Sequence, residues 1–231
     1  MRRYYRKFMN SHLFSFVVKY KESDLWIGLD KTIPGLPLIV YEYIVNLRKQ
    51  VESYQNQQFF ESFTPIDFDE KAPDIVKDMI LASKKANVGP MAAVAGAFAK
   101  FIGQFILKQV ALDKLIVENG GDLYIYSLEE TTIHIFSGSI NLFLILPPGE
   151  FGVATSSGTI GHSKNFGRTD STTIVTRDPT LSDAYATAIS NKIKNVYDAK
   201  IVLKEKYEDI EDIVVVVDKT VVLNCSHEIR W

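Results

Sequence analysis

The chain has 231 residues, of which 46% are hydrophobic and 23% are charged, a balance typical of folded globular proteins. Its 26 basic and 28 acidic residues give a formal net charge of -2, so charge gives no support for binding to nucleic acid or to an anionic membrane surface. The single cysteine, Cys225, excludes a disulfide within the chain and a site built from several thiolates.

The N-terminal part predicts a hairpin followed by helices. Behind a short basic arm, residues 13–20 alternate in polarity and predict a strand, and the next stretch, DLWIGL, completes a hairpin. Apolar side chains at helical spacing predict a long helix from Leu36 to about Gln58, and a second helix spans residues 74–87. The sequence shows no signal peptide and no apolar run of about 18 residues, so we expect a cytoplasmic protein that does not enter a membrane.

A third helix is expected from Pro90, where proline suits the first turn. The stretch PMAAVAGAFAKFIGQF is rich in alanine and glycine, including Gly96 and Gly103. Because these side chains are small, residues 90–103 are predicted to be a buried helix whose backbone approaches a neighbouring element closely.

Strands dominate the next part of the chain. KLIVENGGDLYIYS, TIHIFSG, INLFLIL and FGVATSS are short and are separated by glycine or proline, as in an antiparallel meander. A helix from Thr180 to about Val196 and the strands AKIVL, DIVVVVD and KTVVLN complete the chain. Because helices and strands come in blocks, we expect an α+β fold, a mostly antiparallel sheet with packed helices, in one domain over residues 1–231.

Two glycine-rich breaks between strands are candidate parts of a ligand site. The first contains Asn119, Gly120, Gly121 and Asp122, which suit either a hairpin turn or contacts to a base or ribose. The second, GVATSSGTIGHS at residues 152–163, suits either a polar surface hairpin or a phosphate cradle. Its candidate ligand-binding residues are Thr155, Ser156, Ser157, Gly158, Thr159 and His162. We expect both breaks to line one cleft.

Asp183 and Thr187 are a candidate metal pair. Their spacing places both side chains on one face of a helix, and a carboxylate and a hydroxyl are oxygen ligands that suit Mg²⁺ bound to a diphosphate. A structural alternative is that Thr180 and Asp183 form the capping pattern of a helix start. A serine hydrolase using Ser156 or Ser157 with His162 and Asp170 is a weaker interpretation, because no helix pattern follows and no G-x-S-x-G motif is present.

Taken in order, VGPMAAVAGAFAKFIG, VENGGDLYI, GVATSSGTIGHS, FGRTDS and LSDAYATAISNKI resemble a small cytoplasmic family similar to ApbE, the FAD:protein FMN transferases. The resemblance to the small family spans nearly the whole chain. The resemblance to the transferases themselves is more distant and lies in NGGD, in the serine- and glycine-rich stretch with its histidine, and in a D-A-x-A-T helix.

The resemblance implies an ApbE-like fold and a flavin or nucleotide-like ligand, FAD or FMN, bound with Mg²⁺. It implies metal ligation by Asp183 and Thr187, places Gly120 and Gly121 beside the flavin nucleotide, and places His162 near the transferase histidine. The transferases cleave FAD and attach FMN to a threonine of a target protein. Here HSKNFGRTDS stands where they have H followed by I-D-P-x-T-G, so no catalytic residue is assigned.

Two functions from different classes are compatible with these patterns. One is binding of a flavin nucleotide with Mg²⁺, extending to transfer of FMN to an acceptor protein. The other is a non-catalytic binding or assembly protein that uses the same cleft to serve a metabolic partner, for which the resemblance suggests sulfur assimilation.

Overall fold

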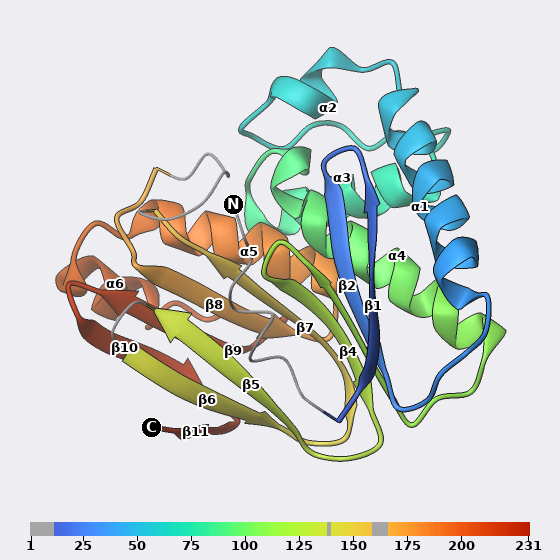
Figure 1. Cartoon of the computed structure of the whole chain (residues 1–231). Coiled ribbons are helices and arrows are strands. Elements are labelled where there is room, and N and C mark those ends of the chain that lie inside the picture. The colour runs from blue at the N-terminus through green and yellow to red at the C-terminus, as the bar shows by residue number, and fades with distance from the viewer. Residues whose placement is uncertain (1–11, 138–139, 159–165) are drawn as a thin grey trace.

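The computed structural model describes residues 12–137, 140–158 and 166–231. Helices cover one face of a large antiparallel sheet, and a small sheet covers part of the other face (Figure 1). The basic arm expected at the N-terminus lies outside the described residues.

The large sheet has eight strands in the order β1-β2-β3-β4-β7-β8-β9-β10, and each neighbouring pair is antiparallel. Its strands are β1 Phe14–Tyr20, β2 Ser23–Leu29, β3 Lys114–Asn119, β4 Asp122–Ser127, β7 Gly149–Ser156, β8 Ser171–Thr176, β9 Ile210–Val217 and β10 Thr220–Cys225. The small sheet has the order β11-β6-β5, with β5 Thr131–Ser137, β6 Ile140–Leu146 and β11 Glu228–Arg230.

Apart from AKIVL, the strands predicted from the sequence are present, but the expected meander is wrong. The chain leaves the large sheet after β4, forms the β5–β6 hairpin in the second sheet, and returns so that β7 pairs with β4. In Figure 1 this hairpin lies in front of the strands that follow it. Apolar side chains from both sheets, among them Ile125, Leu144 and Phe151, fill the space between them.

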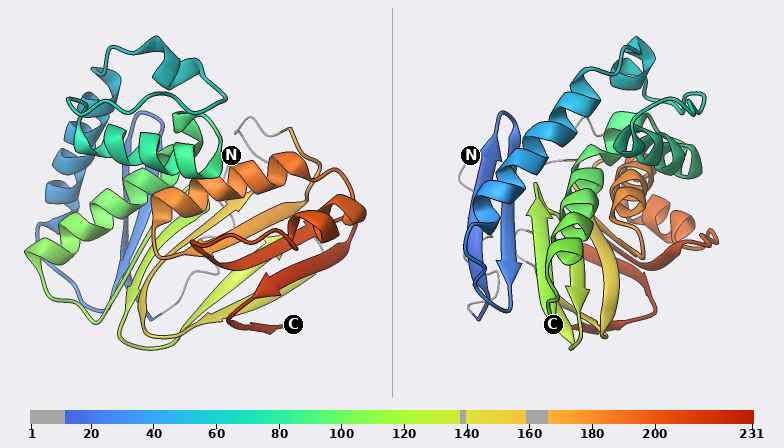
Figure 2. Two further views of the ribbon diagram at one scale, coloured as in Figure 1. Left: turned by 180° about the vertical axis from the view of Figure 1, so that it is seen from behind. Right: turned by 90° about the vertical axis from the view of Figure 1, so that its right-hand side faces the viewer.

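The helices are α1 Leu36–Glu52, α2 Gln57–Glu61, α3 Asp74–Ala86, α4 Val94–Gln109, α5 Pro179–Lys192 and α6 Val196–Val202, with a 3₁₀ turn, η2, at Pro90–Ala93. In the left view of Figure 2, α3, α4 and α5 cross one face of the large sheet. The larger hydrophobic core lies between these helices and the sheet, with Ile44, Met79 and Ile102 fully buried.

Two predictions are wrong: the end of the first long helix and the strand at AKIVL. The long N-terminal helix ends at Glu52 rather than near Gln58, and a bend separates it from α2. The stretch AKIVL belongs largely to α6 and is not a strand. The side chain of Asn195 caps α6 by accepting a hydrogen bond from the amide of Asp198, at 3.0 Å.

The alanine- and glycine-rich helix is confirmed as a closely packed core element. A Cβ atom built on Gly96 meets the carbonyl oxygen of Pro179 at 2.1 Å, and one on Gly103 meets the ring of Tyr124 at 2.2 Å. The stretch Pro90–Gln109 is long and apolar enough to cross a membrane, although its sequence predicts no membrane-spanning segment. Half of that stretch is buried against the rest of the fold, as in core helices of soluble proteins.

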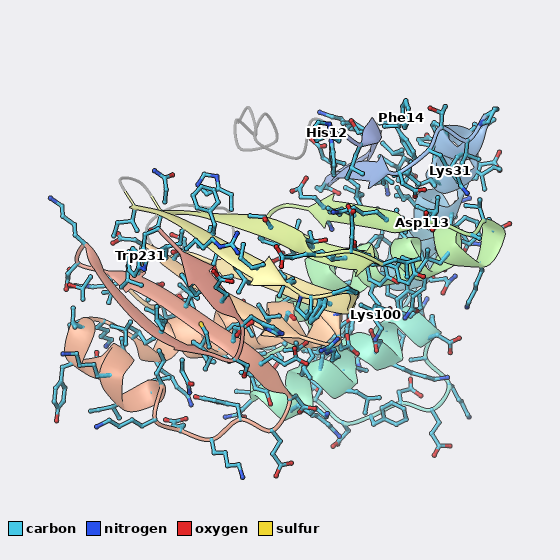
Figure 3. The ribbon with its side chains drawn as sticks, turned by 90° about the horizontal axis from the view of Figure 1, so that it is seen from below. His12, Phe14, Lys31, Lys100, Asp113 and Trp231 are labelled. Carbon is cyan, nitrogen blue, oxygen red and sulfur yellow. The ribbon has the colours of Figure 1, made fainter. Side chains whose placement is uncertain are left out.

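An ion-paired cluster joins three of the helices at one end. The Nζ atom of Lys100 on α4 lies 2.7 Å from a carboxylate oxygen of Asp78 on α3 and 2.6 Å from one of Asp178, which precedes α5. Figure 3 labels Lys100 among these helices. The cluster fixes the start of α5 relative to its two neighbours.

Candidate functional site

The turn between β3 and β4 is a two-residue hairpin. Gly120 and Gly121 have φ angles of 72° and 107°, values that side chains other than glycine rarely adopt. The amide of Gly121 donates to a carboxylate oxygen of Glu118 at 2.9 Å, and no atom lies within 4 Å of a Cβ built on either glycine. The turn therefore requires glycine for its backbone conformation, and it faces open space.

This turn is tied to the start of α4 and to the end of β7. The side-chain amide of Asn119 donates to the carbonyl oxygen of Ala95 at 3.2 Å. The amide of Thr155 donates to a carboxylate oxygen of Asp122 at 3.3 Å. Because β4 and β7 are paired, with Leu123 opposite Val153, the turn lies beside the end of β7.

The serine- and threonine-rich stretch is only partly described. Thr155 and Ser156 belong to β7, where Ser156 is buried opposite Thr172, and the amide of Gly158 donates to the carbonyl oxygen of Thr169 at 3.0 Å. Thr159 and His162 lie outside the described residues. The proposed pairing of a serine with His162 therefore lies outside what the structure describes, and Ser157 and Gly158 are partly exposed.

Asp183 does not cap its own helix, so the alternative that Thr180 and Asp183 form a capping pattern is wrong. The N-cap of α5 is Asp178, whose side chain accepts from the amide of Thr180 at 2.9 Å, with Pro179 in the first turn. An aspartate directly before a proline is a helix-start signal that the sequence analysis missed.

The carboxylate of Asp183 instead meets the first turn of α4. Its Oδ2 atom accepts a hydrogen bond from the backbone amide of Gly96 at 2.9 Å. This contact requires glycine at position 96, because a Cβ there lies 2.8 Å from the Cβ of Asp183. Gly96 and the neighbouring Ala95 are site residues that sequence reasoning missed, and their signal was the small-residue content of α4.

Burial raises the pKa of the Asp183 carboxyl to about 7, although the amides of Gly96 and Ala95 favour the ionised form. The positive end of the α4 dipole lies at the same place, where negative charge is stabilised. Burial and the helix end therefore act in opposite directions on this carboxyl: burial disfavours its charge, whereas the amides and the dipole of α4 favour it.

Asp183, Thr187 and Asn191 form a strip along α5. All three side chains are partly exposed, whereas the other residues between Pro179 and Ser190 are buried. Their spacing of four residues places them on one face of the helix. We call these three residues the α5 strip. The oxygen of Asn191 accepts from the amide of Phe166 at 2.8 Å, which anchors the segment that follows residue 165.

The donor set of the strip fits Mg²⁺ better than a transition metal. The described residues contain no group of three or more histidine, cysteine, aspartate or glutamate side chains arranged to hold a metal ion. One carboxylate and one hydroxyl are hard oxygen ligands, and Mg²⁺ commonly completes such a set with water and substrate phosphates. Asp183 and Thr187 are therefore suited to a metal that arrives with a phosphorylated ligand.

The family model described as AbpE bacteria matches residues 6–227. The UPF0280 protein of Methanococcus vannielii is 36% identical over 189 residues, which cover 78% of this chain and 75% of that protein. A UPF0280 protein of Archaeoglobus fulgidus is 38% identical over 189 residues, covering 78% and 79%.

Solved structures share the fold at low sequence identity. The flavin transferase ApbE from Vibrio cholerae superposes with a TM-score of 0.60 and 13% identity over 93% of this chain and 97% of that chain. The apo flavinyl transferase ApbE of Pseudomonas stutzeri gives a TM-score of 0.57 and 12% identity over 92% and 93%. The fold is that of the ApbE structures, and the chain belongs to the family described as AbpE bacteria, together with its UPF0280 relatives.

Proposed function

We propose that the protein binds a flavin nucleotide together with Mg²⁺, with the phosphates beside the start of α4. Asp183 and Thr187 hold the metal, and the turn Asn119–Asp122 and the end of β7 line the phosphate side of the site. Ser157 and Gly158, which follow β7, are partly exposed. The observation that carries the proposal is the placement of the Asp183 carboxyl on the first turn of α4.

The chemistry of this placement is electrostatic. A diphosphate needs positive charge, which Mg²⁺ supplies when bound, and the amides at the start of a helix add donors for its oxygens. The ionised carboxylate of Asp183 attracts the metal, and the buried surroundings strengthen that attraction. The fold shared with proteins named flavin transferases makes a flavin nucleotide the ligand of choice.

Calorimetric titration with FAD, with and without Mg²⁺, tests the proposal. Asp183→Asn keeps an oxygen that accepts from Gly96 but removes the charge, so we expect FAD affinity in Mg²⁺ to fall on the order of tenfold or more. Thr187→Val keeps the shape and removes one oxygen, so a smaller loss is expected. Asp74→Asn, on an exposed side chain at the start of α3, is the matched control and leaves affinity unchanged.

Thermal melts of the metal-free variants separate binding from folding. Because burial disfavours the ionised Asp183, the neutral asparagine leaves the metal-free protein at least as stable as wild type. Equal FAD affinity in wild type and Asp183→Asn, with Mg²⁺ present, contradicts the proposal.

The proposed complex is also the starting state for transfer of FMN to an acceptor protein in the cytoplasm. We include this transfer in the proposal. Incubation with FAD, Mg²⁺ and a candidate acceptor protein, whose hydroxyl takes the FMN group while AMP leaves, tests this step by chromatography for AMP. AMP that appears with wild type and disappears with Asp183→Asn supports it. FAD that binds and stays intact, with a candidate acceptor present, favours the non-catalytic binding protein.

A further inference from the structure

A cavity of about 670 Å³ lies between the C-terminal ends of two helices and the segment that precedes β9. Its walls come from residues 85–88 at the end of α3, from the second half of α5, and from residues 206–209. Phe63 and Phe166 complete the lining. Cavities of this size accommodate small organic ligands.

Four aromatic rings belong to the walls, those of Phe63, Phe166, Tyr185 and Tyr207. Tyr185 on α5 is buried and meets the ring of Tyr207 edge-on, with centroids 5.9 Å apart. Phe63 and Phe166 meet in the same way at 5.5 Å, yet 55% and 62% of their surface is exposed. Two large apolar rings exposed at one cavity, from segments far apart in the sequence, are suited to cover a planar aromatic group.

The charges around the cavity are balanced, which disfavours a strongly anionic occupant. The ammonium of Lys85 lies 2.9 Å from a carboxylate oxygen of Asp209, and that of Lys192 lies 2.9 Å from Glu205. Lys206 and Glu208 add one charge of each sign to the lining. The negative ends of the α3 and α5 dipoles lie on this side of the fold, where backbone amides already bond to the carbonyl oxygens of Ser83, Lys84 and Ser190.

These features select an uncharged ring that carries hydrogen-bond donors. Ring N–H or amino groups suit the negative ends of the two helix dipoles, and the ring faces match the tyrosine and phenylalanine rings of the lining. A nitrogen heterocycle such as a purine or an isoalloxazine has both properties.

The cavity adjoins the α5 strip through Asn191, which belongs to both. Asp183 lies eight residues before Asn191, a rise of about 12 Å along a helix. We propose that this cavity holds a heterocyclic ring of the nucleotide whose phosphates lie at Asp183 and Thr187. This inference rests on the proposed function for the identity of the ligand, whereas the cavity itself requires no metal.

Ligands that contain only a ring and a sugar or sugar alcohol test the cavity separately from the phosphate site. Adenosine and riboflavin, titrated without metal, report ring binding and show which ring the cavity accepts. Magnesium pyrophosphate reports the site at Asp183. The variants are Ala188→Trp, which fills the cavity from α5, and Tyr207→Ala, which removes one wall.

Tyr197→Ala, on a side chain of α6 that is 73% exposed, is the matched control. We expect one of the two ring ligands to bind to wild type and to the control, and to lose on the order of tenfold in affinity in Tyr207→Ala. Ala188→Trp abolishes this binding if it folds, whereas magnesium pyrophosphate binds equally to all four proteins.

Two other outcomes would separate the cavity from the phosphate site. Ring ligands that fail to bind wild type, or that bind Tyr207→Ala as well as wild type, overturn the inference and leave the phosphate site standing. Ring binding that depends on Tyr207, with no binding of magnesium pyrophosphate to wild type, supports the cavity and removes the proposed phosphate site.

Discussion

Replacement of Gly96 by alanine tests how closely α4 and α5 must approach to form the site. The added methyl carbon lies 2.1 Å from the carbonyl oxygen of Pro179, a backbone atom that cannot rotate away. Real Cβ atoms essentially never lie closer than 3.0 Å to such a neighbour. The two helices therefore have to separate by nearly an ångström, which also stretches the hydrogen bond from Gly96 to Asp183.

Three contributions set the size of the effect. Overpacking of a buried contact costs roughly 1 to 3 kcal/mol. Loss of a hydrogen bond to a charged group costs roughly 1.5 to 3 kcal/mol, and the better helix propensity of alanine returns about 1 kcal/mol. We therefore expect Gly96→Ala to lower the free energy of unfolding by about 3 kcal/mol.

Urea unfolding followed by circular dichroism measures this loss. Gly120→Ala is the matched control, because its Cβ meets no atom within 4 Å and only its φ of 72° is unfavourable. That strain costs about 1 kcal/mol. A Gly96→Ala protein that is as stable as wild type, or more stable as helix propensity alone implies, refutes the close approach of α4 to α5.

Three further predictions concern parts of the fold away from the site. Lys100→Met leaves two carboxylates without their common partner and lowers the free energy of unfolding by roughly 2 kcal/mol, measurable by urea unfolding; an unchanged midpoint contradicts the cluster. Burial raises the pKa of the Cys225 thiol to about 12, so labelling with a thiol reagent at pH 8 is roughly a thousandfold slower in the folded protein than in urea. Asp212→Ala removes the acceptor of the amides of Ser226 and His227 and of the His227 ring, so a thermal melt shows a loss of roughly 3 kcal/mol, and an unshifted melt counts against it.

Local patterns predicted most elements because the residues that define them are neighbours in sequence. Helix α3 matches its predicted range closely, and β9 follows from a run of β-branched residues. Helix α1 ends early because Tyr54, which continues the helical spacing, instead bonds to Asp69 through its hydroxyl at 3.1 Å. That partner is fifteen residues away, so no window around Tyr54 contains it.

The arrangement of the candidate site depended on contacts distant in sequence. The spacing of Asp183 and Thr187 predicted a shared face of a helix, which the structure confirms. That Asp183 meets Gly96 follows only from the packing of α5 on α4, across 87 residues of sequence. The pairing of β4 with β7 around the β5–β6 hairpin could not be predicted from the sequence either. Alternation of polar and apolar side chains identifies a strand but does not show which strand it pairs with.

The layering of the fold has a consequence for its central strands. Strand β9 lies between a helical layer that buries Ile213, Val215 and Val217 and the small sheet, toward which Val214 and Val216 point. Water reaches neither face of a strand enclosed in this way. The usual alternation of polar and apolar side chains is therefore absent, and successive positions are all apolar. Every one of these five positions is therefore closed to a charged residue, whereas the wetter outer strands β1 and β10 accept polar side chains between their apolar ones.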